Sequence, residues 1–163
     1  MVEVRVAHLG LDRTTNSPVV ILREKDGAGV LPIWIGPAEA SAIAMELEGV
    51  KAPRPMTHDL LKQILLGLGG SLKRVNISSV KERTYFAELL VQRDERVFQF
   101  DARPSDSIAL ALRVQAPIFA DAALLDQAVS DSSDTPAPPT LDPEQLKQHL
   151  ERMDPQDFGR FTP

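Results

Sequence analysis

Cysteine is missing from this chain of 163 residues. Its absence excludes disulfide bonds, thiolate zinc sites and a cysteine nucleophile. Long apolar runs are missing too, and no segment reaches the roughly 20 apolar residues that a membrane-spanning helix needs. The chain starts as MVEVRV, which alternates like a strand and does not resemble a signal peptide. We therefore expect a soluble, cytoplasmic protein with no membrane association.

An excess of basic charge is also absent. Residues 1–129 hold 15 Lys and Arg against 16 Asp and Glu, whereas residues 130–163 hold 3 against 7. The domain is nearly neutral and lacks the basic footprint that is common in nucleic-acid-binding proteins. Six basic residues do gather in one hairpin region, where a solvated strand face is one interpretation and a local nucleic-acid patch is the other. They are Lys73, Arg74, Lys81, Arg83, Arg93 and Arg96.

The composition divides the chain into three parts. Hydrophobic residues make up 43% of the sequence, which is enough for one domain with a core, and we place it at residues 1–129. Residues 130–141 are rich in Ser, Asp and Pro and are expected to form a disordered acidic linker. Residues 142–163 begin with a capped helix start. We expect a short helical tail that docks on the domain, binds a protein partner or frays.

Residues 1–129 mix the alternating pattern of strands with the spacing of helices, which predicts an α+β fold. Strands are expected at 2–8, 18–23, 30–35, 72–79, 84–92, 97–101 and 117–120. Helices are expected from Pro37 to about Glu48, from an N-cap at Thr57 to Leu68, from Pro104 to Val114, and at 122–129. The second of these helices carries an apolar stripe at helical spacing, which we expect to be buried. The stripe consists of Leu60, Leu61, Ile64, Leu65 and Leu68.

The helix at 104–114 is apolar almost all round, which argues for burial on more than one side. The helix at 37–48 could supply the second side, because its face of small residues allows a close approach. A subunit interface could supply it as well. We expect a homodimer on this ground, since soluble oligomers are most often symmetric dimers.

A constant offset of 67 positions relates two stretches of the chain. It aligns Pro37 with Pro104 and Glu39 with Asp106, and the strands and turns before them correspond without a gap. Such an offset predicts an internal duplication of β-β-β-α units. The repeats are placed at about 2–49 and 70–115, in a mixed, strongly curved sheet with an extra helix between them. The alternative is that two similar units look alike without a duplication.

Three motifs occur in a specific order along the chain. They are Leu31–Gly36 followed by Glu39-Ala40, then Pro53–Leu60, then Asp101–Asp106. Together they resemble the bifunctional nuclease domain family over about residues 2–129. Ser107 stands where that family often has Ala, and Arg83-Thr84-Tyr85 stands where it often has Gly-Thr-Phe. The resemblance implies two repeats of three strands and a helix, and nuclease activity on RNA and DNA.

The same motifs hold the residue types that phosphodiester hydrolysis uses. Carboxylates commonly bind one or two divalent ions, a base activates the water, and a cation balances the phosphate charge. The candidate catalytic residues are Glu39, His58, Asp59 and Asp106, and the three acids among them are the candidate ligands of a Mg²⁺ or Mn²⁺ ion. The candidate substrate-binding residues are Arg54, Arg103 and Ser105, and Asp101 is a further acid nearby in sequence.

Whether these residues act together depends on how the repeats pack. Packing face to face would bring Glu39 near Asp106, with His58 and Asp59 beside them if the intervening helix begins nearby. Alternatively, each acid at a helix start could simply cap free N–H groups, and Arg103 could pair locally. Two function classes therefore stay open. One is a nuclease of low sequence specificity, and the other is a non-catalytic module that binds a ligand or partner with the same charged cluster.

Overall fold

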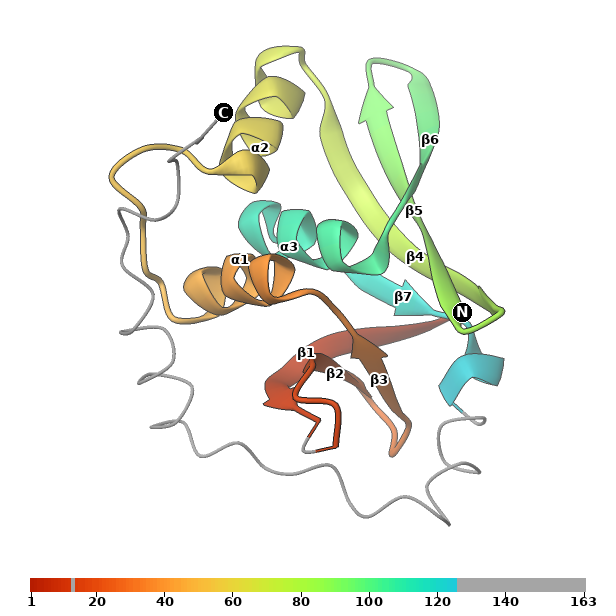
Figure 1. Ribbon diagram of the computed structural model, residues 1–163. Coiled ribbons are helices and arrows are strands. Elements are labelled where there is room, and N and C mark those ends of the chain that lie inside the picture. The colour runs from red at the N-terminus through yellow and green to blue at the C-terminus, as the bar shows by residue number, and fades with distance from the viewer. Residues whose placement is uncertain (13, 126–163) are drawn as a thin grey trace.

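The computed structural model describes residues 1–12 and 14–125 (Figure 1). The expected linker at 130–141 and the helical tail at 142–163 lie outside the described residues, as do the last residues of the helix expected at 122–129. Within the described part, residues 122–125 are helical. No helix there is both long and apolar enough to cross a membrane.

A mixed sheet of seven strands forms the frame of the fold. The strands are β1 (Val2–Leu11), β2 (Pro18–Glu24), β3 (Val30–Trp34), β4 (Ser71–Lys81), β5 (Thr84–Arg93), β6 (Arg96–Ala102) and β7 (Ile118–Ala120). They lie in the order β3-β2-β1-β7-β4-β5-β6. All neighbours are antiparallel except β4 and β7, which are parallel. The short strand β7 therefore joins two antiparallel units of three strands each.

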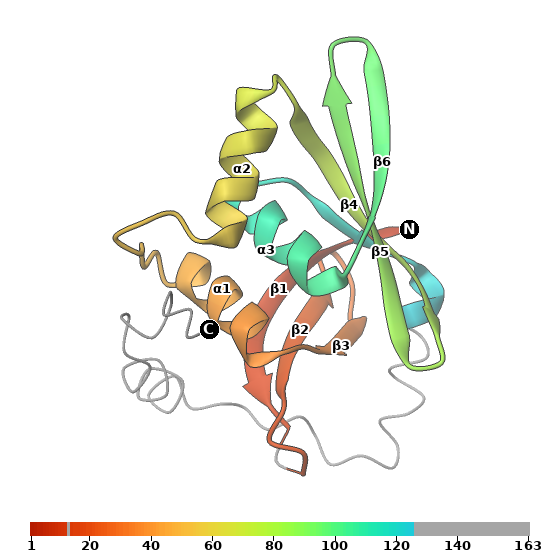
Figure 2. The same cartoon turned by 45° about the horizontal axis from the view of Figure 1, so that its top comes forward.

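Besides the helical residues 122–125, the described part of the chain contains three longer helices: α1 (Pro37–Leu47), α2 (Thr57–Gly67) and α3 (Pro104–Val114). Figures 1 and 2 show α3 between α1 and α2, and α3 packs against both of them and against β4 and β5. The chain leaves α3 through Gln115, whose positive φ of 57° is the left-handed conformation that often ends a helix.

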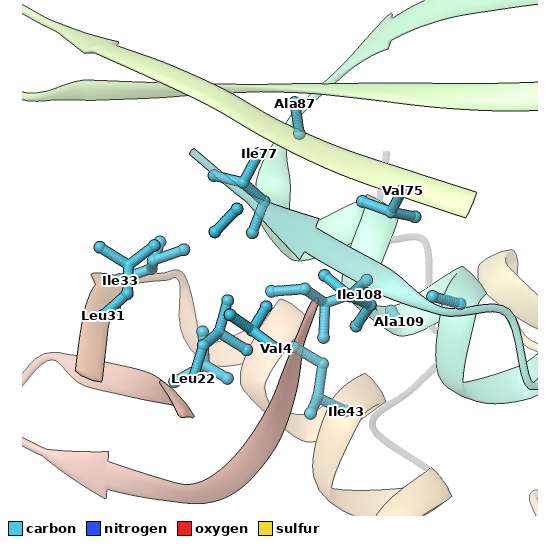
Figure 3. Close-up of a cluster of buried hydrophobic side chains, with 14 of the residues drawn as sticks. Val4, Leu22, Leu31, Ile33, Ile43, Val75, Ile77, Ala87, Ile108 and Ala109 are labelled. Carbon is cyan, nitrogen blue, oxygen red and sulfur yellow. The ribbon is translucent and has the colours of Figure 1, made fainter. Parts of the chain in front are cut away.

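The core lies between the sheet and the two helices α1 and α3 (Figure 3). It takes branched apolar side chains from both halves of the sheet, and the helices contribute Ile43 and the run Ile108–Ala111. That run is at most 2% exposed. The all-round apolar character of α3 is thus explained within the chain by contacts with α1, α2 and the sheet. We expected a homodimer because α3 is apolar almost all round. That argument no longer applies, because α3 leaves no apolar side uncovered.

Two predictions for α2 are wrong. The N-cap is Met56 and not Thr57, so the helix begins at Thr57, one residue earlier than predicted. The N–H of Met56 donates to Oδ2 of Asp59 at 2.9 Å. The apolar stripe of α2 is mostly exposed, and only Leu65 packs against the core cluster. Among the described elements α2 packs mainly against α3, and this packing leaves Leu60, Leu61, Ile64 and Leu68 exposed.

The strand order is symmetric about β7, and each outer strand, β3 or β6, leads directly into a helix. This arrangement is the one that a duplication of β-β-β-α units would give, with α2 as the additional helix. The duplication itself stays a prediction from the sequence offset. In the fold, α1 and α3 each start directly after an edge strand of the sheet.

Candidate active site

The starts of α1 and α3 are built alike. Each helix has Pro in its first turn, after an extended N-cap residue: Gly36 before α1 (φ −74°, ψ 160°) and Arg103 before α3 (φ −69°, ψ 143°). Proline fits there because the first helical N–H has no partner to lose. Each first turn also carries one acid, Glu39 or Asp106, near the positive end of the helix dipole.

Arg103 joins the two helix starts. Its Nη1 lies 2.9 Å from Oε1 of Glu39, and its Nε lies 2.7 Å from Oδ2 of Asp106. A second bond runs from Nη2 to Oδ1 of Asp106 at 3.2 Å, so the guanidinium binds Asp106 with two nitrogens. The side chain of Arg103 is nevertheless 66% exposed. The hydrogen bonds and charge of Asp106, followed by those of Glu39, raise the pKa of Arg103.

His58 enters the same group from the first turn of α2. Its Nε2 lies 3.0 Å from Oδ1 of Asp106, and its side chain is 12% exposed. Burial alone would raise the pKa of Asp106, but the hydrogen bonds and charges of Arg103 and His58 together lower it. Asp106 is therefore a carboxylate at neutral pH, and His58 presents an N–H to it. We call Glu39, His58, Arg103 and Asp106 the Arg103 cluster.

Asp59, the neighbour of His58, lies in a different network. Its Oδ1 accepts from Nε of Arg113 at 2.7 Å, and its Oδ2 accepts from the N–H of Met56. Burial would raise the pKa of Asp59, but the bonds from Arg113 and Met56 outweigh it and lower the pKa. Lys62 adds a bond from Nζ to the backbone oxygen of Arg113 at 2.7 Å. These contacts fasten the start of α2 to the end of α3.

The sequence patterns did not single out Arg113, although a signal was available. Its side chain is only 4% exposed, and its Nη1 donates to the backbone oxygen of Ala109 at 2.9 Å. A single arginine inside the apolar run 108–114 needs a buried partner, because an unpaired buried charge is very costly. Asp59 fills that need, but nothing in the sequence pairs these two residues with each other.

The other predicted residues are spread over the surroundings of the cluster. Ser105 lies in the first turn of α3, two residues after Arg103, and is only 6% exposed. Arg54 is exposed on the link between α1 and α2 and makes no ion pair with the part of the chain that the structure describes. Asp101 is exposed on β6, opposite Glu88 of β5, and is not part of the cluster.

The three candidate metal ligands do not come together in one site. Among residues 1–12 and 14–125, no group of three or more His, Cys, Asp or Glu side chains is placed to hold an ion. Asp59 is occupied by Arg113 and Met56, and Arg103 lies between Glu39 and Asp106. The residues present in this arrangement therefore do not fit a three-carboxylate metal centre.

Gly36 makes room for the Glu39 side chain. A Cβ atom at position 36 would collide with Oε2 of Glu39, and the three atoms nearest to it would all belong to that carboxylate. The carboxylate of Glu39 can thus fold back over the helix start while its Oε1 binds Arg103. The glycine helps set the direction in which Glu39 meets the cluster.

Comparison of the sequence with known proteins identifies the family of the chain. The model of the bifunctional nuclease domain matches residues 20–133. A Mycobacterium tuberculosis protein that is named only as uncharacterized is 44% identical over 164 residues, which covers 97% of this chain and 98% of that protein.

Two plant relatives carry a functional name. Bifunctional nuclease 1 of Arabidopsis thaliana is 28% identical over 105 residues, covering 62% of this chain and 32% of the plant protein. Bifunctional nuclease 2 of Oryza sativa subsp. japonica is 30% identical over 105 residues, again covering 62% of this chain and 32% of the relative. The similarity to the plant proteins thus concerns one third of their length. Since the domain model matches more than half of the chain, the chain belongs to the bifunctional nuclease domain family.

Proposed function

We propose that the protein hydrolyses phosphodiester bonds in RNA and DNA with low sequence specificity, and that the Arg103 cluster is its active site. The observation that carries the proposal is one exposed guanidinium held between two carboxylates, beside a histidine on one of them. Family membership supports the reaction class, since plant relatives are named bifunctional nucleases.

Arg103 is suited to bind the phosphate. Its side chain is two-thirds exposed, so part of the guanidinium is open to solvent. A planar guanidinium can offer two parallel N–H groups to a phosphate, and charge that develops on the phosphate in the transition state strengthens this contact. Arg54, exposed and without an ion pair among the described residues, is the second candidate cation.

His58 is suited to act as the base. Asp106 accepts the hydrogen of Nε2, which fixes the ring and leaves Nδ1 to accept a proton. In hydrolysis, the oxygen of water forms a bond to phosphorus while its proton passes to Nδ1. The leaving oxygen takes a proton from solvent water as its bond to phosphorus breaks, and the imidazolium of His58 returns its extra proton to solvent. Asp106 stabilises the imidazolium that forms, because it stays ionised.

The dependence on Mg²⁺ or Mn²⁺ stays a prediction from the sequence, and the roles given to Arg103 and His58 do not need an ion. Direct catalytic roles of Asp59 and Ser105 are also predictions that the assay must decide. The contacts of Asp59 with Arg113 and Met56 favour a structural role for it. The cytoplasmic location stays an expectation as well.

The test is cleavage of labelled single-stranded RNA and DNA by the purified full chain, with Mg²⁺, with Mn²⁺ and with chelator. We expect cleavage of both substrates, and a loss of at least about 100-fold in His58→Gln. His8→Gln is the matched control, because His8 lies in β1 outside the cluster. Cleavage that continues in the presence of chelator would exclude the metal mechanism. Unchanged cleavage in His58→Gln would exclude His58 as the base.

A second function is favoured by one observation. Both oxygens of Asp106 are already hydrogen-bonded to Arg103 and His58, so this carboxylate has partners without a ligand. A non-catalytic module that binds a ligand or a partner through Arg103 would have this property too. If the folded protein cleaves neither substrate under any of the metal conditions, this second function replaces the first.

A further inference from the structure

Trp34, the single tryptophan of the chain, is the last residue of β3 and is 51% exposed. Ile33 before it is 2% exposed and points into the core, so Trp34 points away from the core. One exposed apolar residue is ordinary, and exposure alone assigns no role to the ring. Two further features of Trp34 do: its indole is held in place, and it lies near the Arg103 cluster.

Asp12 holds the indole of Trp34 at its edge. The indole N–H donates to Oδ2 of Asp12 at 2.9 Å, and Oδ1 of Asp12 accepts from the N–H groups of Thr14 and Thr15 at 2.8 and 3.3 Å. The bond from Trp34 is the main cause that lowers the pKa of Asp12, so the acceptor is a carboxylate at neutral pH. The bond uses the ring edge and neither face. Among the described residues, no aromatic ring or cation stacks on Trp34.

Trp34 also lies a short distance from the Arg103 cluster. Gly36 follows two residues later, so the Cα atoms of the two residues are at most about 7 Å apart. A Cβ atom on Gly36 would be 3.6 Å from Oε1 of Glu39, and that oxygen is 2.9 Å from Nη1 of Arg103. The guanidinium of Arg103 therefore lies within about 15 Å of the Cα atom of Trp34. Figures 1 and 2 both show the end of β3 near the start of α3.

We propose that Trp34 stacks on an unpaired base of the same nucleic-acid strand whose phosphate Arg103 binds. A strand stacked as in duplex DNA advances about 3.4 Å per nucleotide, so about 15 Å corresponds to about four nucleotides, and one strand can reach both residues. The proposal rests on the nuclease function proposed above. It adds that the substrate is single-stranded around the cleaved bond and that Trp34 contributes to binding it.

The chemistry around the ring favours a base as the ligand. Every base has a flat face, so an aromatic platform binds strands of any sequence, in agreement with a nuclease of low specificity. The carboxylate of Asp12 lies at the ring edge and repels phosphate, so the base and not the backbone meets the ring. Because the hydrogen bond already fixes the indole, stacking costs little further ordering. The bases of a duplex are stacked on each other and offer no free face.

Tryptophan fluorescence of the full chain tests the contact, because Trp34 is its only tryptophan. The probe is an oligodeoxythymidine of about 12 nucleotides, a length within the range that one single-strand site covers. His58→Gln is used for the titration, so that binding is measured without the proposed base. We expect a loss of emission that saturates with the probe. A strand of equal length without bases and a duplex of equal length should leave the emission unchanged.

Cleavage kinetics give the second readout. Trp34→Leu should raise KM for single-stranded DNA about fivefold or more, as loss of one stacked base does, and leave kcat within about twofold. Trp34→Phe keeps a ring and should restore most of the loss. Phe98→Leu is the matched control, because Phe98 is another exposed aromatic residue, 41% exposed on β6 toward the β5–β6 turn, and its KM should not change.

The outcomes separate this proposal from the nuclease function. Emission that ignores the probe, while the wild type cleaves it, would overturn the stacking and leave the nuclease function intact. Equal quenching by the strand without bases, or an unchanged KM in Trp34→Leu, would overturn the stacking too. Quenching by the probe in a protein that cleaves no substrate would support the stacking and overturn the hydrolysis.

A second variant keeps the test valid if Trp34→Leu does not fold. Asp12→Ala retains the ring and removes the hydrogen bond that fixes it. We expect KM to rise about twofold or more with kcat unchanged, because the ring must then be ordered on binding. An unchanged KM in this variant would overturn the role of the held indole.

Discussion

Two arginine–aspartate pairs lie near opposite ends of α3, and they differ most in how far solvent reaches them. Arg103 meets Asp106 and Arg113 meets Asp59, and in both pairs Nε lies 2.7 Å from a carboxylate oxygen. The side chain of Arg103 is 66% exposed, whereas that of Arg113 is 4% exposed. The contact distance therefore says nothing about role. Access for a substrate separates a candidate active site from a structural anchor.

The difference in solvent exposure also determines how much each ion pair contributes to the free energy of unfolding. An exposed ion pair contributes about 0–1 kcal/mol to stability. Breaking a buried pair costs about 3–5 kcal/mol, because one charge is left buried without a partner. Asp59 is still one third exposed, so its pair with Arg113 should fall below that range. The two pairs should thus respond in opposite ways to the same substitution.

The largest effect is expected from Arg103→Met. Removing the exposed guanidinium should lower the cleavage rate at least about 100-fold, as for other groups that stabilise transition-state charge. The free energy of unfolding should change by less than about 1 kcal/mol. Single-turnover cleavage and urea unfolding measure the two quantities. Arg23→Met, at an exposed position of β2, is the control and should change neither.

Arg113→Met should lower the stability of the fold and leave the cleavage rate nearly unchanged. We expect the free energy of unfolding to fall by about 2–3 kcal/mol, because Oδ1 of Asp59 and the backbone oxygen of Ala109 lose the hydrogen bonds that the Arg113 side chain donates. Cleavage per folded molecule should stay within a few-fold of the wild type. Urea unfolding gives the stability, and activity is measured below the midpoint. A variant of full stability with a hundredfold slower cleavage would place Arg113 in the active site instead.

Acid should weaken both pairs. The pKa values of Asp106 and Asp59 are lowered from 3.8, so their stabilisation is complete above that pH and is lost as the pH falls through the folded-state values. The wild type should therefore lose stability between about pH 5 and pH 2. Asp106→Asn removes one of these groups, so its stability should depend less on pH over that window. Denaturant midpoints at a series of pH values measure the difference.

The smallest effect is expected from Gly36→Ala. The added Cβ should push the carboxylate of Glu39 away from Arg103 and leave the fold unchanged, since the nearest atoms belong to that flexible side chain. Loss of one exposed ion pair is worth about 0.5 kcal/mol, which corresponds to a change of about two- to threefold in cleavage. The direction, an increase in KM, tests whether Glu39 orients the phosphate-binding arginine. An unchanged KM would mean that Glu39 has no such role.

The sequence predicted the elements of the fold well where they have local signals. Pro37 and Pro104 mark the starts of α1 and α3 because proline fixes the backbone there, and the alternating strands fall near their predicted places. The exposure of the α2 stripe could not be predicted. The spacing of Leu60 and Ile64 indicates that the helix has an apolar face, but not which element, if any, will cover it.

The candidate site was predicted in part. The sequence left two arrangements open, convergence of the starts of α1 and α3 if the repeats pack face to face, and local pairing of Arg103. In the structure Arg103 pairs locally with Asp106 and also reaches Glu39 on the other helix. The separation of His58 from Asp59 did not follow, because adjacent helical residues point about 100° apart and only tertiary packing decides what each meets. In this fold Asp59 binds Arg113 near the C-terminal end of α3 and so points away from the Arg103 cluster.

The most direct measurement compares two isosteric variants, Asp106→Asn and Asp59→Asn, in the same cleavage assay at equal concentrations of folded protein. Each removes one carboxylate charge from an arginine and leaves the side-chain shape unchanged. We expect Asp106→Asn to lose at least about 100-fold in rate, whereas Asp59→Asn should lose stability and keep its rate within a few-fold. Equal losses of rate, or a greater loss in Asp59→Asn, would contradict the assignment of the Arg103 cluster as the active site.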